Sequence, residues 1–145
     1  MEFKKIIIGI DDSRQSEKAA TYGFALAKLL GAAVALVEVV EPMAVVPPVN
    51  TGIVGGEIDM LSMTPSVDIL DAQEASAKTV MQRFVAMYGE EHNITQYLET
   101  GDAATVLVDT ATVFDADLIV VGSHARTGFS RFFCRKRSRR CNAPY

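Results

Sequence analysis

Two acidic residues and a glycine-containing segment, far apart in the chain, carry groups that could bind a nucleotide. Asp11 and Asp12 follow an apolar run that ends at Ile10, and Gly122 follows the apolar residues 118–121. A carboxylate at the end of a strand could accept hydrogen bonds from a base or a ribose, or hold a metal ion through phosphate oxygens. A glycine-containing loop can bring backbone N–H groups close to a phosphate. These residues therefore predict a nucleotide-type site.

Each of these residues also has a purely structural interpretation. Asp11 and Asp12 precede Ser13, a plausible N-cap, so either carboxylate could simply stabilise the start of a helix by about 0.3–1 kcal/mol. We favour a ligand-binding role for Asp11 and a capping role for Asp12. His124 lies in the glycine-containing segment, where it could contact a phosphate or remain solvated. We assign no role to His92, in a predicted surface turn.

Motifs for metal binding and covalent catalysis are missing from the sequence. Cys134 and Cys141 have no second cysteine pair or nearby histidine, which is poor spacing for zinc. No serine lies in a nucleophile elbow, no Walker lysine follows a glycine-rich loop, and G-x-G-x-x-G is absent after the first apolar run. We therefore expect no catalytic residue and no protein metal site, and a binding protein in place of an enzyme.

Alternating apolar runs and amphipathic segments must position the candidate residues. The predicted strands cover residues 3–10, 33–40, 94–99 and 118–121, the last of them buried on both faces. The predicted helices run from a Ser13 cap to a Gly31 stop and over residues 67–88 and 103–114. Residues 42–66, rich in proline and glycine, predict a long loop. The alternation implies right-handed crossovers and an open parallel sheet with helices on both faces, an α/β fold.

Helical spacing also predicts which side chains face the core. In the first helix these are Ala19, Ala20, Tyr22, Gly23, Leu26, Leu29 and Leu30. In the second helix they are Ile69, Ala72, Ala75, Val80, Phe84 and Met87. Both sets recur at intervals of three and four residues, as expected for one face of a helix.

Charge is distributed unevenly along the 145 residues, although the net charge is only −4. Residues 1–130 hold 8 basic and all 18 acidic side chains, a charge of −10, whereas residues 131–145 hold six basic side chains and both cysteines. Such a basic run can bind nucleic acid. The acidic body and the lack of an aromatic stacking platform to accompany the run argue against that, so we expect no nucleic-acid partner. No apolar run approaches the roughly 18 residues of a membrane span, and we expect a cytoplasmic protein.

Residues 1 to about 133 resemble the universal stress protein family. The resemblance rests on Lys-Lys-Ile-Ile-Ile-Gly-Ile-Asp-Asp-Ser at 4–13, Ala-Leu-Val-Glu-Val-Val at 35–40, Gly-Asp-Ala at 101–103, and most specifically on residues 116–131. It implies a Rossmann-like α/β domain of strand order 3-2-1-4-5, a cytoplasmic homodimer and, in one branch, binding of ATP, with Mg²⁺, without dedicated ATPase activity. Carried over by position, Ile10, Asp11 and Val39 border the adenine and ribose. The phosphate loop is Val121, Gly122, Ser123, His124, Ala125 and Arg126.

The chain departs from the family's phosphate motif, which is Gly, two residues, Gly, nine residues, Gly, then Ser or Thr. Counted from Gly122, the second glycine is replaced by Ala125, the third by Arg135 and the hydroxyl residue by Lys136. The fourth helix and fifth strand are also missing or altered, so the expected strand order is 3-2-1-4. We expect phosphate binding to be weakened.

Residues 134–145 form an atypical basic tail beyond the predicted domain, 1–133. We interpret this tail as the product of a shifted reading frame. One set of codons for it reads Ala-Gly-Ser-Val-Ala-Glu-Asp-Val-Met-Pro-Leu when shifted by one base, which restores the glycine and serine in register. The alternative is a genuine, divergent tail.

The sequence thus favours an ATP-binding module of the stress response or of signalling. The alternative is a protein-interaction module of the same fold that binds no nucleotide and uses residues 42–66 and an exposed sheet edge. An incomplete sheet would leave a strand edge open, which favours dimers.

Overall fold

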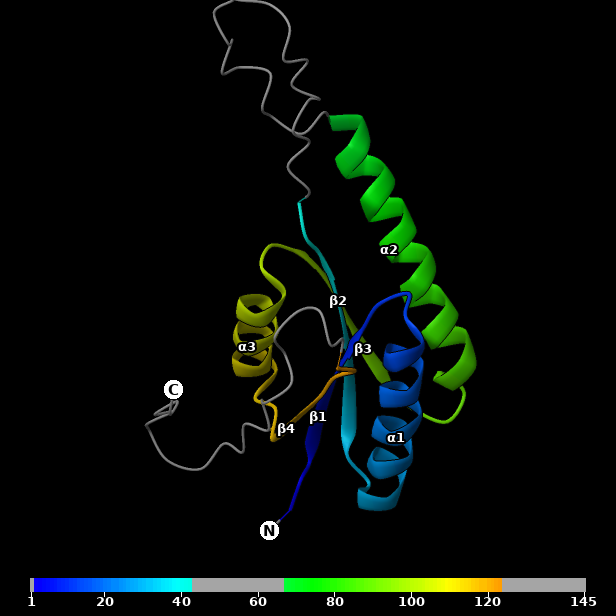
Figure 1. Cartoon of the computed structure of the whole chain (residues 1–145). Helices are drawn as coiled ribbons and strands as arrows, with labels where there is room; N and C mark the ends of the chain where they lie inside the picture. Colours follow the sequence, from blue (N-terminus) through cyan, green and yellow to red (C-terminus); the bar gives the residue numbers. More distant parts are fainter. Residues whose placement is uncertain (1, 43–66, 124–145) are drawn as a thin grey trace, which may run out of the picture.

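The computed structural model describes residues 2–42 and 67–123, which form a four-stranded parallel sheet flanked by three helices (Figure 1). The strands are β1 (Lys5–Ile10), β2 (Ala33–Val40), β3 (Ile94–Thr100) and β4 (Leu118–Val120), in the order β3-β2-β1-β4. The helices are α1 (Arg14–Leu30), α2 (Val67–Tyr88) and α3 (Ala103–Phe114). The predicted fold class and strand order are confirmed.

Strand β1 is central because its side chains are apolar on both faces. Ile6, Ile7 and Ile8 are fully buried. Ile7 pairs with Ala35 of β2 on one side and with Ile119 of β4 on the other. A run without polar alternation is typical of a parallel strand covered on both faces.

Two apolar layers enclose the sheet. Ile6 and Ile8 pack with Phe24 of α1 and Phe84 of α2, whereas Ile7 packs with Leu107 of α3. Successive strand residues point to opposite faces, so α1 and α2 cover one face and α3 covers the other (Figure 1).

Capping residues define the ends of α1, as predicted, and the start of α3. The Ser13 hydroxyl accepts a hydrogen bond from Ser16 N at 3.1 Å, and Gly31 adopts a left-handed conformation with φ 62°. At α3, Asp102 is the N-cap and accepts from Thr105 N at 3.0 Å. The predictions of a Ser13 cap and a Gly31 stop are therefore confirmed.

The predicted core face of α1 was partly wrong. Tyr22 and Leu29 are 74% and 82% exposed, and Leu30 is also exposed. The buried side consists mainly of small residues, namely Ser16, Ala19, Ala20, Gly23, Phe24 and Ala27. Small residues let α1 lie close to the sheet around Phe24, while Tyr22 and Leu29 point to solvent.

The predicted core face of α2 was wrong in its first half and at its end. Ala72 and Ala75 are exposed, and so is Met87, at 54%. Figure 1 shows the amino-terminal half of α2 extending beyond the strands, where the described residues provide no layer to cover it. The buried residues are Ala77, Val80, Met81 and Phe84.

Several smaller predictions also need correction. β1 begins at Lys5 and not at Phe3, and β4 is half-buried because, among the described strands, it pairs with β1 alone. His92 is half-buried, with its ring 5.0 Å from that of Phe24, so it has a packing role. The predicted long loop from residue 43, the altered fourth helix and fifth strand, and the basic tail lie outside the described residues.

Within the described ranges, no helix combines the length and apolar composition that crossing a membrane requires.

Candidate functional site

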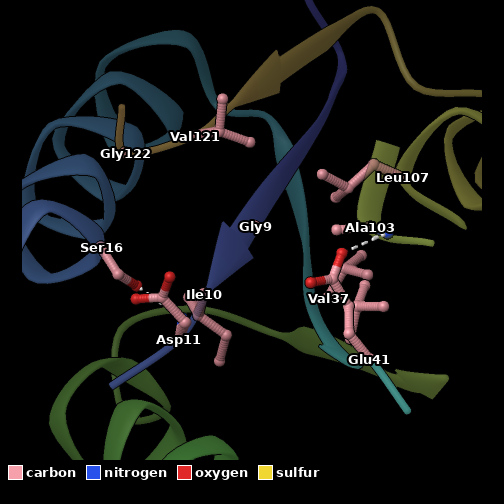
Figure 2. A pocket seen from close by; sticks show the side chains of 11 residues that line it. Gly9, Ile10, Asp11, Ser16, Val37, Glu41, Ala103, Leu107, Val121 and Gly122 are labelled. Atoms are coloured by element: carbon pink, nitrogen blue, oxygen red, sulfur yellow. Dashed lines mark hydrogen bonds between the residues drawn. The ribbon is translucent and has the colours of Figure 1, made fainter. Parts of the chain in front are cut away.

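A hollow of about 280 Å³ opens at the carboxyl ends of β1, β2 and β4 (Figure 2). It lies beside β1, where the chain changes from strands on one side, β2 and β3, to a strand on the other, β4. Ligands of open α/β sheets bind at this kind of switch point, beyond the carboxyl ends of the strands.

Five of the nine predicted site residues line this hollow: Ile10, Asp11, Val39, Val121 and Gly122. They come from three strand ends that are distant in sequence. Ser123 is exposed and is not among the lining residues. The remaining predicted site residues, His124, Ala125 and Arg126, lie outside the described residues. The structure therefore brings the residues expected to border the adenine and ribose close to the start of the predicted phosphate loop. Their binding roles remain predictions.

Asp11 belongs to a hydrogen-bonded turn that joins β1 to α1. Its Oδ1 accepts from Ser13 N at 2.8 Å, and its own backbone N–H donates to the hydroxyl of Ser16 at 2.8 Å. Ser16 is only 2% exposed. Within the described residues, Oδ2 of Asp11 makes no hydrogen bond, so a turn-stabilising role and a ligand-binding role are compatible.

Asp12 points to a different part of the molecule. Its carboxylate forms an ion pair with Arg83 of α2 at 3.0 Å, and it does not line the hollow. The capping role expected for Asp12 is not found, because Ser13 is the N-cap of α1. Asp12 instead ties the start of α1 to α2.

Gly122 allows the end of β4 to contact the first turn of α1. A Cβ atom at this position would lie 2.5 Å from the carbonyl carbon of Gln15 and 2.8 Å from Ser16 N. Backbone atoms in a helix cannot move aside cheaply, so position 122 requires glycine for packing. This requirement comes in addition to any close approach of a phosphate.

Sequence reasoning missed six residues that line the hollow: Gly9, Ser16, Val37, Glu41, Ala103 and Leu107. Glu41 had a detectable signal, since it follows the second strand as Asp11 follows the first. Its Oε1 accepts a hydrogen bond from Ala103 N, at 3.1 Å, and so links the end of β2 to the start of α3. The other five residues had no such signal in the sequence, because their positions depend on how α1 and α3 pack on the sheet.

A further carboxyl group lies at this end of the sheet, on the face covered by α1 and α2. Glu38 is 7% exposed, and its Oε2 has no hydrogen-bond partner among the described residues. Burial, reinforced by the negative charges of Asp11 and Asp12 and opposed by Arg83, raises the pKa of Glu38 to about 8. Glu38 is therefore predominantly protonated at neutral pH.

In residues 2–42 and 67–123, no group of three or more His, Cys, Asp or Glu side chains is arranged to hold a metal ion.

A parallel sheet of order 3-2-1-4 with helices on both faces gives an α/β protein of the Rossmann-like, adenine nucleotide alpha hydrolase-like fold. The sequence pattern of the universal stress protein family matches residues 2–141, and the chain belongs to this family. The match extends past residue 133, and the predicted domain boundary there stays a prediction.

Solved structures of the family share this fold. A universal stress protein from Burkholderia pseudomallei superimposes with a TM-score of 0.66 at 21% identity, covering 84% of this chain and 83% of that one. UspA from Lactobacillus plantarum gives a TM-score of 0.63 at 24% identity, over 91% and 85% of the two chains. A universal stress protein from Archaeoglobus fulgidus, solved in complex with dAMP, gives 0.54 at 22% identity, over 83% and 82%. A search of curated proteins found no match.

Proposed function

We propose that this chain binds an adenine nucleotide, ATP, in the hollow and acts as a nucleotide-dependent module of the stress response or of signalling. The observation that carries the proposal is the meeting of Asp11, Val39 and Gly122 around one hollow at the switch point of the sheet. Nucleotides bind at such points, and a family member of the same fold has been solved with dAMP. We propose binding without turnover, so the protein is not an enzyme.

The lining of the hollow supports a specific orientation of the nucleotide. Val37, Val39 and Leu107 offer apolar contacts for a planar base, and the free oxygen of Asp11 can accept hydrogen bonds from ribose hydroxyls. The phosphates then extend toward Gly122 and the segment that follows it. A hollow of about 280 Å³ is near the lower bound for small-molecule pockets, which suits the nucleoside part of the ligand.

Mg²⁺ fits this site only as a partner of the nucleotide. The described residues form no metal cluster, and Mg²⁺ is commonly held by substrate phosphates with one or two carboxylates. Asp11 is the carboxylate positioned to contribute. The ion would neutralise phosphate charge beside an acidic lining.

We further propose that the protein acts in the cytoplasm as a homodimer. Among the described strands, β4 pairs with β1 alone. Its second edge presents backbone donors and acceptors that could pair with another chain.

The decisive experiment compares ATP binding by this chain with binding by a frame-restored chain, in which the tail from Cys134 onward is replaced by Ala-Gly-Ser-Val-Ala-Glu-Asp-Val-Met-Pro-Leu. Calorimetric titration and mass spectrometry of co-purified nucleotide provide the readouts. We expect tighter binding in the frame-restored chain, because it regains the glycine at 135 and the hydroxyl at 136 and departs from the phosphate motif only at Ala125.

Asp11→Ala tests the assigned site, and Asp68→Ala, an exposed aspartate on α2, is the matched control. Asp11→Ala should weaken ATP binding about tenfold, the value of one charge-assisted hydrogen bond, and the control should not. Absence of ATP binding in both the original and the frame-restored chain would favour an interaction module without a nucleotide.

A further inference from the structure

Glu41 occupies a fixed position on the wall of the hollow. It follows the end of β2 at Val40, and its Oε1 accepts a hydrogen bond from Ala103 N, at 3.1 Å, in the first turn of α3. Figure 2 shows this bond and the side chain running along the wall from the end of β2 toward α3. A carboxylate near a helix amino terminus is also favoured by the helix dipole. Glu41 is exposed, and this bond directs one of its two carboxylate oxygens to the start of α3 before any ligand arrives.

Capping alone does not account for Glu41. The N-cap of α3 is Asp102, which accepts hydrogen bonds from the backbone N–H of Thr105, at 3.0 Å, and from its hydroxyl, at 2.8 Å. The backbone bond, followed by the hydroxyl bond, lowers the pKa of Asp102, as expected for a working cap. Within the described residues, Oε2 of Glu41 makes no hydrogen bond, so it remains available at the hollow.

The surroundings of Glu41 decide what that oxygen can bind. Its neighbours on the wall, Val37, Val39 and Leu107, are apolar, and no described lining residue is a lysine or arginine. A carboxylate in this setting repels phosphate and accepts hydrogen bonds from N–H groups. The part of the ligand that reaches Glu41 must therefore be a hydrogen-bond donor.

The place of Glu41 in the sheet matches the base end of the proposed nucleotide. Glu41 extends β2 and Gly122 extends β4, with β1 between them. Strands are spaced about 4.8 Å apart, so the two ends are roughly 10 Å apart across the sheet. With the phosphates near Gly122, the base lies near Val39 and Glu41.

Resting on the proposed function, we propose that Glu41 is a specificity-determining residue that accepts a hydrogen bond from the exocyclic amino group of a 6-aminopurine. The α3 amino terminus positions its carboxylate, and the apolar walls align the base with it. A purine without this amino group cannot make this hydrogen bond.

The test measures affinities for ATP and for purine riboside triphosphate, which lacks only the 6-amino group. Titrations followed by NMR of the backbone amides of Asp11 and Gly122 detect weak binding, in the original and in the frame-restored chain. We expect the unsubstituted protein to prefer ATP about tenfold, the factor of one charge-assisted hydrogen bond. Glu41→Ala should bind both ligands equally, and Glu41→Gln should keep part of the preference through its carbonyl oxygen.

Glu74→Ala, an exposed glutamate on α2, is the matched control and should keep the full preference. A merely structural role of Glu41, through its bond to Ala103, would weaken both ligands equally and leave their ratio unchanged, which would overturn the inference. Equal binding of both ligands by the unsubstituted protein would do the same while leaving ATP binding intact. Absence of any ATP-induced shift at Asp11 and Gly122 in either chain would instead overturn the proposed function, and this inference with it.

Discussion

Single residues at the carboxyl edge of the sheet show how the same side-chain type is used differently by position. Asp11 and Glu41 line the hollow, Asp12 pairs with Arg83, and Glu38 is buried on the opposite face from α3. Asp11, Asp12 and Glu41 follow strands, and Glu38 lies within β2, two residues before its end. The role of each carboxyl group therefore depends on its burial and on the charges around it.

Glu38 should make stability depend on pH. Its pKa is about 8 in the folded protein and near 4.5 when unfolded, so the folded state binds the proton more tightly. The stability that this group contributes is fully present below about pH 4.5 and is lost as pH rises through about 8. We expect Glu38→Gln to remove this loss, so that urea unfolding curves of the variant and the original protein diverge as pH rises from 5 to 9.

A matched substitution, Glu99→Gln on the exposed edge strand β3, should leave the pH profile unchanged. Parallel pH profiles of Glu38→Gln and the original protein would contradict the assigned pKa shift.

Gly122 and Gly23 should differ in their tolerance of alanine. The added Cβ at 122 would meet the backbone of Gln15 at 2.5 Å, whereas at 23 it would meet the terminal Cδ1 of Ile8 at 2.6 Å. A side-chain end can adjust and a helix backbone cannot. We expect Gly122→Ala to cost about 1–3 kcal/mol in free energy of unfolding, as overpacking does. Gly23→Ala should cost less, because alanine also favours the helix by about 1 kcal/mol. Equal losses in thermal unfolding would refute this distinction.

At the scale of secondary-structure elements, the site depends on how three segments end. β1 leads through the Asp11–Ser13 turn into α1, β2 leads to Glu41, and β4 ends against α1 at Gly122. Hydrogen bonds between elements hold these ends in place: Asp11 N to Ser16, and Ala103 N to Glu41. The polar groups of the hollow thus come from the ends of elements, while Val37 and Leu107, from the interiors of β2 and α3, supply apolar lining.

Ser16 should be important for the β1–α1 connection. Its hydroxyl is buried and accepts the backbone N–H of Asp11 at 2.8 Å. Ser16→Ala would leave that donor unsatisfied, which costs about 1–3 kcal/mol. Chemical denaturation should show this loss, and amide exchange at Asp11 should become faster.

Thr21→Ala is the appropriate comparison, since the Thr21 hydroxyl is exposed, where it donates to Glu17 O at 2.9 Å and lies 3.3 Å from the hydroxyl of Tyr88. We expect little change in its stability. If Ser16→Ala proved as mild as Thr21→Ala, the turn would not depend on the buried hydroxyl.

For the molecule as a whole, the described residues make a sheet with β1 covered on both sides and β4 at one edge. The side chains of β4 are half-buried, so apolar surface remains there within the described part of the chain. Apolar surface beside an open strand edge favours association with a second chain.

We therefore expect a dimer. Sedimentation velocity should show a species of twice the chain mass that dissociates on dilution, with apparent thermal stability rising with concentration as mass action requires. A monomer at every concentration, with high thermal stability, would contradict this expectation.

Much of the architecture could be predicted because it depends on local patterns. The uninterrupted Ile6-Ile7-Ile8 run, the Ser13 cap and the Gly31 stop each specify their own backbone conformation through short-range sterics and hydrogen bonding. Alternation of strands and helices then leaves few topologies. The meeting of Asp11 with Gly122 at one edge follows from that topology.

The sequence by itself determined the elements, since periodicity and capping act over a few residues, and their alternation determined a parallel sheet with Asp11 and Gly122 at one edge. The strand order was implied by the resemblance to the family. Only the tertiary structure decided that Tyr22 and Leu29 face outward, that Glu38 is buried without a partner, and that Glu41 is held by the first turn of α3. These outcomes depend on which helix packs against which face and how closely. Such packing is set by contacts between segments tens of residues apart, and no local pattern encodes it.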